Sequence, residues 1–389
     1  MADVNRVQEI LAALIRFDTV SAHSNLALIH WVRDYLLGHG VESTLVPNDE
    51  GTKANLYATL GPVRPGGVVL SGHTDVVPVE GQAWSSDPFR VTPRANRLYG
   101  RGTADMKSFI AVALALAPEI LARAPRAPIH LALSYDEEVG CIGVPHLLAR
   151  LARDLPKPRA AIVGEPTMMQ VVTGHKGLAA WRTVFTGVEA HSSRIEETVS
   201  AIFAAARFID FLQRLAEELR QGAKDPSFEP PFTTINVGKI AGGQAMNIVA
   251  GQCTIEWEFR PLPSTDADAL GARIRGFVEN ELRPALKRKH KAADVEIVQL
   301  AGGPGLAPEP NSIAEALARR LTGSNRSGTV AYGTEGGHFQ RAGISAVVCG
   351  PGDIEQAHKP DEFVALDQLA QCAVFLGKLK DWAAGSPEF

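Results

Sequence analysis

The sequence predicts an α/β protein in which a large discontinuous domain, built on a mostly parallel sheet flanked by helices, is interrupted by a smaller inserted α+β domain. Strand and helix patterns alternate through the first third of the chain, which is typical of βαβ units. The middle third instead combines two long helical patterns with four strand patterns, and the alternation returns near residue 302. The expected boundaries are 1–177 and 301–389 for the large domain and 178–300 for the insertion.

The elements of the first third follow from apolar residues at helical spacing and from short apolar runs bounded by turn residues. Segment 4–16 has this helical spacing, and it carries no cleavage site after an apolar core. It is therefore predicted to be an amphipathic helix and not a signal peptide. Further helices are expected at 25–39 and 105–123, and strands at 55–60, 68–71, 129–134, 160–163 and 171–173.

The rest of the chain is divided by the same signals, and two helices laid over four strands predict a compact α+β unit. In the insertion, strands are expected at 179–185, 232–238, 253–259 and 294–300, and helices at 196–220 and 266–289. In the final part, helices are expected at 312–321 and 366–382, with a strand at 346–349 between them.

Composition excludes several classes of protein. With 39 Lys+Arg and 43 Asp+Glu among 389 residues, the net charge of −4 argues against a nucleic-acid-binding protein. Apolar residues make up 45% of the chain, but no run of about 18 of them occurs, so no membrane helix or membrane partner is expected. The cysteines form no CxxC pair, which argues against a disulfide framework or a thiolate zinc site and favours a cytoplasmic location. They are Cys141, Cys253, Cys349 and Cys372.

Candidate functional residues cluster where predicted strands end, which is where ligands bind in open α/β sheets. His73 ends the apolar run VVLSGHTD, and Asp75 lies two residues further on. That spacing directs both side chains to the same side of an extended chain. It suits a metal-bound imidazole that is oriented by a carboxylate, although a strand-end turn with ordinary polar residues is the alternative.

Three further acids are candidate functional residues. Asp105, in YGRGTADMKS, opens a helical stretch and is either a ligand or a helix N-cap. Glu137 and Glu138, in YDEEVG, follow an apolar strand. Adjacent acids repel one another unless cations compensate them or protons remain bound, so they are either a metal-binding pair or part of a surface loop.

Two more groups complete the set. Glu165, in AIVGEPT, lies just past a short strand, and His358 lies in the loop CGPGDIEQAHKPDEF, where an imidazole could also simply be solvated. Together with His73, Asp105, Glu137 and Glu138 they make six groups, most of them at the ends of separate predicted strands. Oxygen and nitrogen ligands without thiolates favour a catalytic zinc or cobalt site over a structural one.

At this point the sequence resembles the M20 family of co-catalytic metallopeptidases and amidases. The similar segments span residues 71 to 363 in the family's order, and they are SGHTDVVP, YGRGTADMK, SYDEEVGCIG, VGEPT and AHKPDEF. The resemblance implies that Asp105 bridges two zinc ions, for which cobalt can substitute. It also implies that His73 and Glu165 complete one metal position, and that Glu138 and His358 complete the other.

The same resemblance implies further roles. Glu137 would be the general base, Asp75 would orient His73, and the Asp105–Met106 peptide bond would be cis. The large domain would be catalytic, and the insertion would act as a lid and carry the contacts of a homodimer.

The resemblance also implies residues that bind the substrate. His191, in FTGVEAHSS, would reach across the dimer to the substrate carbonyl oxygen, although a surface loop histidine is the alternative reading. Arg260 would pair with the substrate carboxylate, since a planar guanidinium suits that group. Asn247 would lie near the same subsite. Gly336 and Gly337 would form a loop whose backbone approaches the substrate.

Within the family, the segments VGEPTMMQVVTGHKG and YGTEGGHFQ are most similar to those of acetylornithine deacetylases. This similarity implies a small-molecule N-acyl amino acid substrate, with hydrolysis of N2-acetyl-L-ornithine in arginine biosynthesis as the expected reaction. The alternatives are succinyl-diaminopimelate desuccinylase, another N-acyl amino acid amidohydrolase, a carboxypeptidase of the same family, or a non-catalytic member that kept only the fold.

Overall fold

The computed structural model describes residues 4–385, which fall into two compact units. Unit 1 consists of the described parts of Met1–Gly174, Leu306–Thr329 and Thr334–Phe389. Unit 2 consists of His175–Gly305 and Val330–Gly333. No helix among the described residues is both long and apolar enough to span a bilayer.

Unit 1 is built on an eight-stranded sheet with the order β1-β2-β6-β3-β7-β14-β8-β13. The central strands β6, β3, β7 and β14 are parallel to their neighbours in this series, whereas β1, β2 and β8 add antiparallel pairs. The predicted mainly parallel sheet is therefore confirmed. The strands are β1 Ser43–Pro47, β2 Ala54–Leu60, β3 Val68–His73, β6 Ile129–Ser134, β7 Ala160–Pro166, β8 Val172–His175, β13 Gly328–Val330 and β14 Ser345–Gly350.

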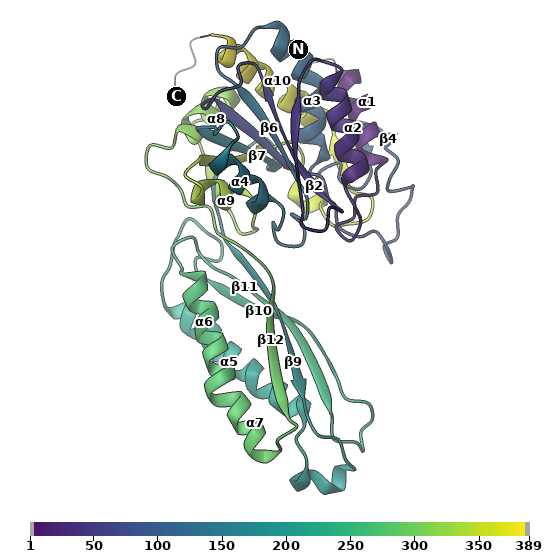
Figure 1. The fold of residues 1–389 in the computed structure, drawn as a ribbon, viewed down its shortest axis with the longest axis vertical. Coiled ribbons are helices and arrows are strands. Elements are labelled where there is room, and N and C mark those ends of the chain that lie inside the picture. The colour runs from purple at the N-terminus through teal and green to yellow at the C-terminus, as the bar shows by residue number, and fades with distance from the viewer. Residues whose placement is uncertain (1–3, 386–389) are drawn as a thin grey trace. The chain divides into compact units, whose positions relative to one another are not determined.

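Helices flank this sheet, and in Figure 1 α4 and α9 lie in front of it, with α3 and α10 behind. Successive strand residues point to opposite faces. One alternating set, which includes Leu70, Leu131 and Ile162, belongs to a core shared with α1, α3 and α10. The helices are α1 Val4–Ile15, α2 Leu26–Leu37, α3 Lys107–Ala122, α4 Val144–Arg153, α8 Ile313–Thr322, α9 Gly336–Arg341 and α10 Leu366–Ala384.

A small second sheet and one short helix complete unit 1. The sheet has the order β15-β5-β4, which joins a late segment of the chain to an early one. Its strands are β4 Thr92–Arg94, β5 Arg97–Tyr99 and β15 Phe363–Ala365, and a 3₁₀ turn covers Ile354–Gln356.

Unit 2 is a four-stranded antiparallel sheet with the order β10-β11-β9-β12 and helices packed on it. Its core is aromatic: the rings of Trp181 and Trp257 stack with centroids 5.6 Å apart, and Phe208 meets Trp257 edge-on. The strands are β9 Leu178–Thr186, β10 Thr234–Gly242, β11 Gln252–Arg260 and β12 Asp294–Gly303. The helices are α5 Ala201–Gln221, α6 Ala267–Phe277 and α7 Arg283–Lys289, with a 3₁₀ turn at Ser192–Glu197.

Two helices of unit 2 differ from their predicted extents for identifiable reasons. The helix expected at 196–220 begins only at Ala201, because Ser200 caps it by accepting a hydrogen bond from Phe203 N. The helix expected at 266–289 is divided by a π-helical turn at Val278–Leu282. Pro284 lies just beyond this turn, and proline supplies no N–H for the regular i to i−4 ladder.

Candidate metal centre

The carboxyl ends of the four parallel strands bring the predicted ligands to one edge of the sheet. His73 is the last residue of β3, and Glu165 is the penultimate residue of β7. Glu137 and Glu138 follow β6, and His358 lies in the loop after β14. Because neighbouring parallel strands end at the same edge, residues far apart in the sequence meet here.

Asp105 lies between the two histidines. Its Oδ1 is 3.0 Å from His73 Nε2, and its Oδ2 is 3.4 Å from His358 Nε2. On the first side, Glu165 Oε1 is 3.5 Å from His73 Nε2. On the second side, Glu138 Oε2 is 2.9 Å from His358 Nε2. The carboxylate of Asp105 is therefore shared between one His–Glu pair and another.

Two overlapping groups of side chains are close enough to share an ion. One ligand atom from each of His73, Glu137 and Glu165 lies within 4.8 Å of the others, and the same holds for His73, Asp105 and Glu138. These donors are imidazole nitrogens and carboxylate oxygens, a set that suits zinc and related divalent metals.

Asp105 is free to face this cluster because it does not cap the helix that follows it. Helix α3 begins at Lys107, and its N-cap residue is Met106, with no side-chain cap. The peptide bond between Asp105 and Met106 is cis, as the family resemblance implied. The alternative interpretation of Asp105 as an N-cap is therefore wrong.

The carboxylates of the cluster crowd one another in a buried place. Burial, aided by the charges of neighbouring carboxylates, raises the pKa of Glu137 to about 8 and that of Glu138 to about 7. The same causes raise the pKa of Glu165 well above its usual value. Oε1 of Glu165 is buried and accepts no hydrogen bond among the described residues. Cations would relieve this repulsion, so the cluster fits divalent metal ions.

The pKa values of the two imidazoles are raised as well, which for a histidine favours the charged form. Hydrogen bonds to Asp105 and Glu138 raise the pKa of His358 to about 10. Burial opposes charge on His73, but the charge of Glu165 and the hydrogen bonds to Asp105 and Asp75 raise its pKa well above 6.5. Positive charge is thus favoured at the positions where metal ions would supply it.

The carboxylate of Asp75 holds the turn that carries the two glutamates. Its Oδ1 accepts a hydrogen bond from Glu137 N at 3.1 Å, and its Oδ2 accepts from Glu138 N at 3.2 Å and from Ser21 Oγ at 2.7 Å. His73 Nδ1 lies 3.0 Å from the main-chain oxygen of Asp75 and 3.6 Å from its carboxylate. The nearer partner of the imidazole is therefore the backbone, and the carboxylate serves the turn.

Sequence reasoning missed two buried acids beside the cluster. Glu335 accepts a hydrogen bond from Ser71 Oγ at 3.0 Å, and its charge is one of the influences that raise the pKa of Glu137. Glu362 accepts bonds from the loop that leads to Asp105. The first directly precedes Gly336 and the second lies within AHKPDEF, so both were inside segments already singled out.

Gly336 and Gly337 do not form the expected loop. They are the first two residues of α9, and Gly336 N donates to Thr334 Oγ1. Glycine disfavours a helix, but the main-chain oxygen of Glu335 accepts from His338 N, and the fully buried Phe339 anchors the short helix. Packing therefore outweighs the low helix propensity of the two glycines, and the loop that the resemblance implied is not formed.

The three remaining candidates lie in unit 2. His191 and Asn247 are neighbours there, because Ser192 N donates to the main-chain oxygen of Asn247 and His191 bridges to Ile248. His191 Nδ1 accepts from Ser193 N at 3.2 Å, so its Nε2 carries the proton of a neutral ring. Arg260 is engaged by Glu258 through two bonds of 3.1 Å.

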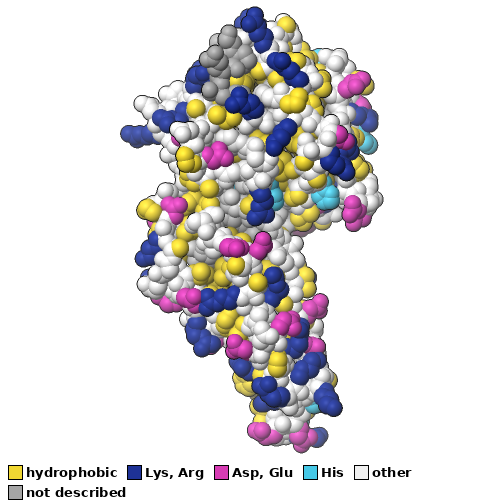
Figure 2. Space-filling model, turned by 60° about the vertical axis from the view of Figure 1, so that its left-hand side comes forward, with side chains coloured by type: hydrophobic (Ala, Val, Ile, Leu, Met, Phe, Trp, Pro, Cys, Tyr) yellow, Lys and Arg dark blue, Asp and Glu magenta, His cyan; other side chains and the backbone are white. Residues whose placement is uncertain are grey.

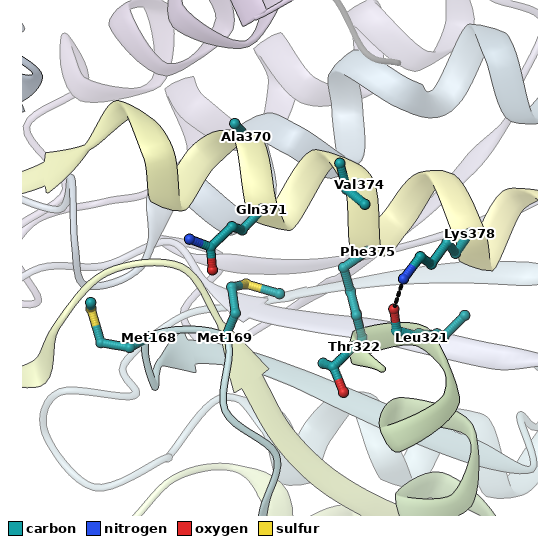
Figure 3. Close-up of a pocket in the computed structure, with 9 residues that line it drawn as sticks. All are labelled: Met168, Met169, Leu321, Thr322, Ala370, Gln371, Val374, Phe375 and Lys378. Atoms are coloured by element: carbon teal, nitrogen blue, oxygen red, sulfur yellow. Dashed lines mark hydrogen bonds between the residues drawn. The ribbon is translucent and has the colours of Figure 1, made fainter. Parts of the chain in front are cut away.

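A separate cavity of about 320 Å³ in unit 1 contains none of the predicted site residues. It lies between α8, α10 and the turn at Met168 and Met169 (Figure 3). Most of its lining is apolar, and Lys378 Nζ already donates to the main-chain oxygen of Leu321 at 2.9 Å.

On the face seen in Figure 2, basic and acidic side chains are interspersed.

The fold and the cluster are those of an enzyme with a candidate dinuclear metal site. The family model described as Peptidase family M20/M25/M40 matches residues 69–380. The acetylornithine deacetylase of Myxococcus xanthus is 35% identical over 373 residues, covering 95% of this chain and 95% of that protein. The chain belongs to peptidase family M20/M25/M40 and is a hydrolase of that family.

Solved structures share this fold. The M20 family metallo-carboxypeptidase Sso-CP2 of Sulfolobus solfataricus superimposes with a TM-score of 0.78 at 17% identity, covering 97% of this chain and 99% of that one. The YXEP protein of Bacillus subtilis, described as a dinuclear metal-binding peptidase of the M20 family, has a TM-score of 0.65 at 15% identity, with 97% of each chain covered. At these identities the likeness concerns the fold alone.

Proposed function

We propose that the protein hydrolyses the amide bond of N2-acetyl-L-ornithine to give L-ornithine and acetate, a step of arginine biosynthesis. The observation that carries the proposed chemistry is Asp105, whose two carboxylate oxygens face two different His–Glu pairs. The choice of substrate is supported by the 35% identity to the acetylornithine deacetylase of Myxococcus xanthus.

The residues present would hold two zinc ions, for which cobalt could substitute. His73, Glu165 and Asp105 would hold one, and Glu138, His358 and Asp105 the other. When bound, such ions polarise a carbonyl group and lower the pKa of water to about 7. Glu165 Oε1, which is buried and accepts no hydrogen bond among the described residues, and the crowding of the carboxylates support this assignment.

Glu137 is the proposed general base. It would take a proton from the attacking water and later deliver it to the departing amine, a role that needs a pKa near the working pH. Burial already raises the pKa of Glu137 to about 8 in the absence of metal. The thiol of Cys141 donates to Glu137 Oε1 at 3.4 Å, and Asp75 accepts from the backbone N–H of Glu137, so the residue is held once at its carboxylate and once at its backbone.

Residues of unit 2 are proposed to bind the substrate as unit 2 closes over the site. The Nε2–H of His191 would donate to the carbonyl oxygen as negative charge develops on it. Arg260 would receive the α-carboxylate, in competition with Glu258, and Asn247 would line the same subsite.

We propose that the active species is a homodimer in which His191 acts on the partner's site. The surface around His191 supports this proposal, since Ile195, Met246 and Ile248 are large apolar side chains exposed there. Strand β10 is in addition an open edge of the unit 2 sheet, with mostly exposed residues.

The test is steady-state hydrolysis by protein loaded with zinc or with cobalt. The panel contains N2-acetyl-L-ornithine, N-succinyl-diaminopimelate, other N-acetyl amino acids and a peptide that ends in glutamate. Highest kcat/KM on acetylornithine is expected. Clear turnover of another panel member with none of acetylornithine contradicts the substrate, and no turnover of any member by metal-loaded dimer contradicts the reaction.

A further inference from the structure

The loop that leads to Asp105 is held by a single buried carboxylate. Glu362 Oε1 accepts hydrogen bonds from Ala104 N at 2.7 Å and from Asp105 N at 3.0 Å. Its Oε2 accepts from Gly102 N at 3.0 Å and from Arg101 Nη1 at 2.8 Å. The side chains of Glu362 and Arg101 are 0% and 1% exposed, so all four donors meet one fully buried anion.

The same network reaches the backbone of His358 from the other side. Arg101 Nη2 donates to Gln82 Oε1 at 2.7 Å, and Gln82 Nε2 donates to the main-chain oxygen of His358 at 2.9 Å. The φ of His358 is 64°, in the left-handed region that non-glycine residues rarely adopt. A hydrogen bond to its carbonyl therefore fixes a conformation that the residue does not favour by itself.

These contacts make one chain of bonds from the backbone of Asp105 to the backbone of His358. The side chains of those two residues meet at 3.4 Å, and neither Glu362 nor Gln82 makes a side-chain hydrogen bond to any predicted ligand side chain. The hydrogen bonds of the network therefore reach the ligands through the main chain, and their role is to position those ligands.

We propose that Glu362, Arg101 and Gln82 form a positioning network that sets the separation of Asp105 and His358. By doing so, the network sets the affinity for metal of the position that Asp105 and His358 share with Glu138. The inference rests on the proposed metal-dependent function. Such outer partners of metal ligands typically account for about 10- to 100-fold in metal affinity.

The two ends of the network predict different effects. Gln82→Ala releases the backbone of His358 and one bond of Arg101, but it leaves all four hydrogen bonds to Glu362 in place. It should therefore weaken the His358 position more than the position of His73 and Glu165. Glu362→Gln places an amide NH₂ against backbone N–H donors that need an acceptor, so it should also loosen Asp105. Because Asp105 faces both pairs, Glu362→Gln should weaken both positions.

The experiment measures Co²⁺ binding to metal-free full-length protein by calorimetry, together with the visible absorption of the bound Co²⁺. His358→Ala identifies which binding step belongs to the His358 position. Glu309→Gln and Gln340→Ala are matched controls, because Glu309 accepts from Ser345 Oγ and Gln340 Nε2 in a polar network elsewhere in unit 1. Thermal unfolding of each metal-free variant shows whether the fold is retained.

A 10- to 100-fold weaker step in Gln82→Ala, at the step lost in His358→Ala and with an altered Co²⁺ spectrum, supports the proposal. Wild-type affinity at both steps in folded Gln82→Ala overturns it, as does an equal loss in the two controls. If Glu362→Gln fails to fold, Gln82→Ala alone decides. If the wild-type protein binds no Co²⁺, the proposed function itself fails, and this inference fails with it.

Discussion

Replacement of Asp75 by asparagine tests whether its carboxylate holds the general base. The carboxylate accepts from the N–H groups of Glu137 and Glu138 and from Ser21 Oγ. An amide offers one oxygen and turns its NH₂ group toward the remaining N–H, so at least one of these bonds is lost. A hydrogen bond to a charged group contributes about 1.5–3 kcal/mol, and about 1.4 kcal/mol corresponds to a tenfold change in rate.

We therefore expect kcat of Asp75→Asn to fall about 10- to 150-fold. This range applies if the lost hydrogen bond is the one to Glu137 N and its whole free energy is added to the activation free energy of hydrolysis. KM should change little, because Asp75 is 2% exposed. The assay is steady-state hydrolysis of acetylornithine with the metal content of each sample measured. Ser21→Ala is the matched control, since it leaves both backbone bonds intact and should cost less.

Two results would refute this reasoning. If kcat stays within threefold of the wild-type value while both metals are bound, the bonds to the turn do not hold the base. If Asp75→Asn instead loses a metal ion, the carboxylate acts mainly on His73, at 3.6 Å, as the family resemblance implies.

Three further outcomes are expected. Glu137→Gln should lower kcat by about 10²–10⁴ while metal content, measured by mass spectrometry, is retained; loss of the metals would reassign Glu137 as a ligand. Glu258→Gln should free the guanidinium of Arg260 and lower KM for substrates that carry an α-carboxylate, but not for the corresponding amides. An equal change in KM for acids and amides would show that Glu258 does not compete with the substrate carboxylate for Arg260. His130 is buried, and burial lowers its pKa to about 4. As the pH falls, His130 is therefore protonated in the unfolded chain at a higher pH than in the folded protein. Stability should therefore be intact above pH 6.5 and fall by up to about 3 kcal/mol as the pH drops to 4. The free energy of unfolding, measured with urea at several pH values, should depend less steeply on pH in His130→Gln than in the wild type. Equal pH dependence in the two proteins would contradict the role of His130.

The cluster of candidate ligands could be predicted because strand ends are visible in the sequence. Each of His73, Glu137 and Glu165 lies at the end of an apolar run or just beyond it, and adjacent parallel strands place such ends together. The pairing of Asp105 with two histidines could not be derived from spacing. It depends on the order of strands in the sheet, and only the family resemblance supplied it.

The supporting contacts were beyond sequence reasoning for a physical reason. Glu362 accepts mainly from backbone N–H groups, which every residue type except proline carries, so no residue pattern marks its partners. The three-residue strands β4, β5 and β15 are too short to show a period. Helix α4 was not among the predicted helices, although its buried Val144, Leu147, Leu148 and Leu151 follow helical spacing.

The order of the site residues along the chain bears on how the protein is made. The candidate ligands begin at His73 and end at His358, with Glu362 four residues later and all of unit 2 in between. A nascent polypeptide on the ribosome therefore exposes an incomplete set of candidate ligands until His358 has emerged. A cation at the proposed His358 position would be acquired only after that point, and a product truncated before residue 358 would carry the crowded acids with no imidazole to complete that position.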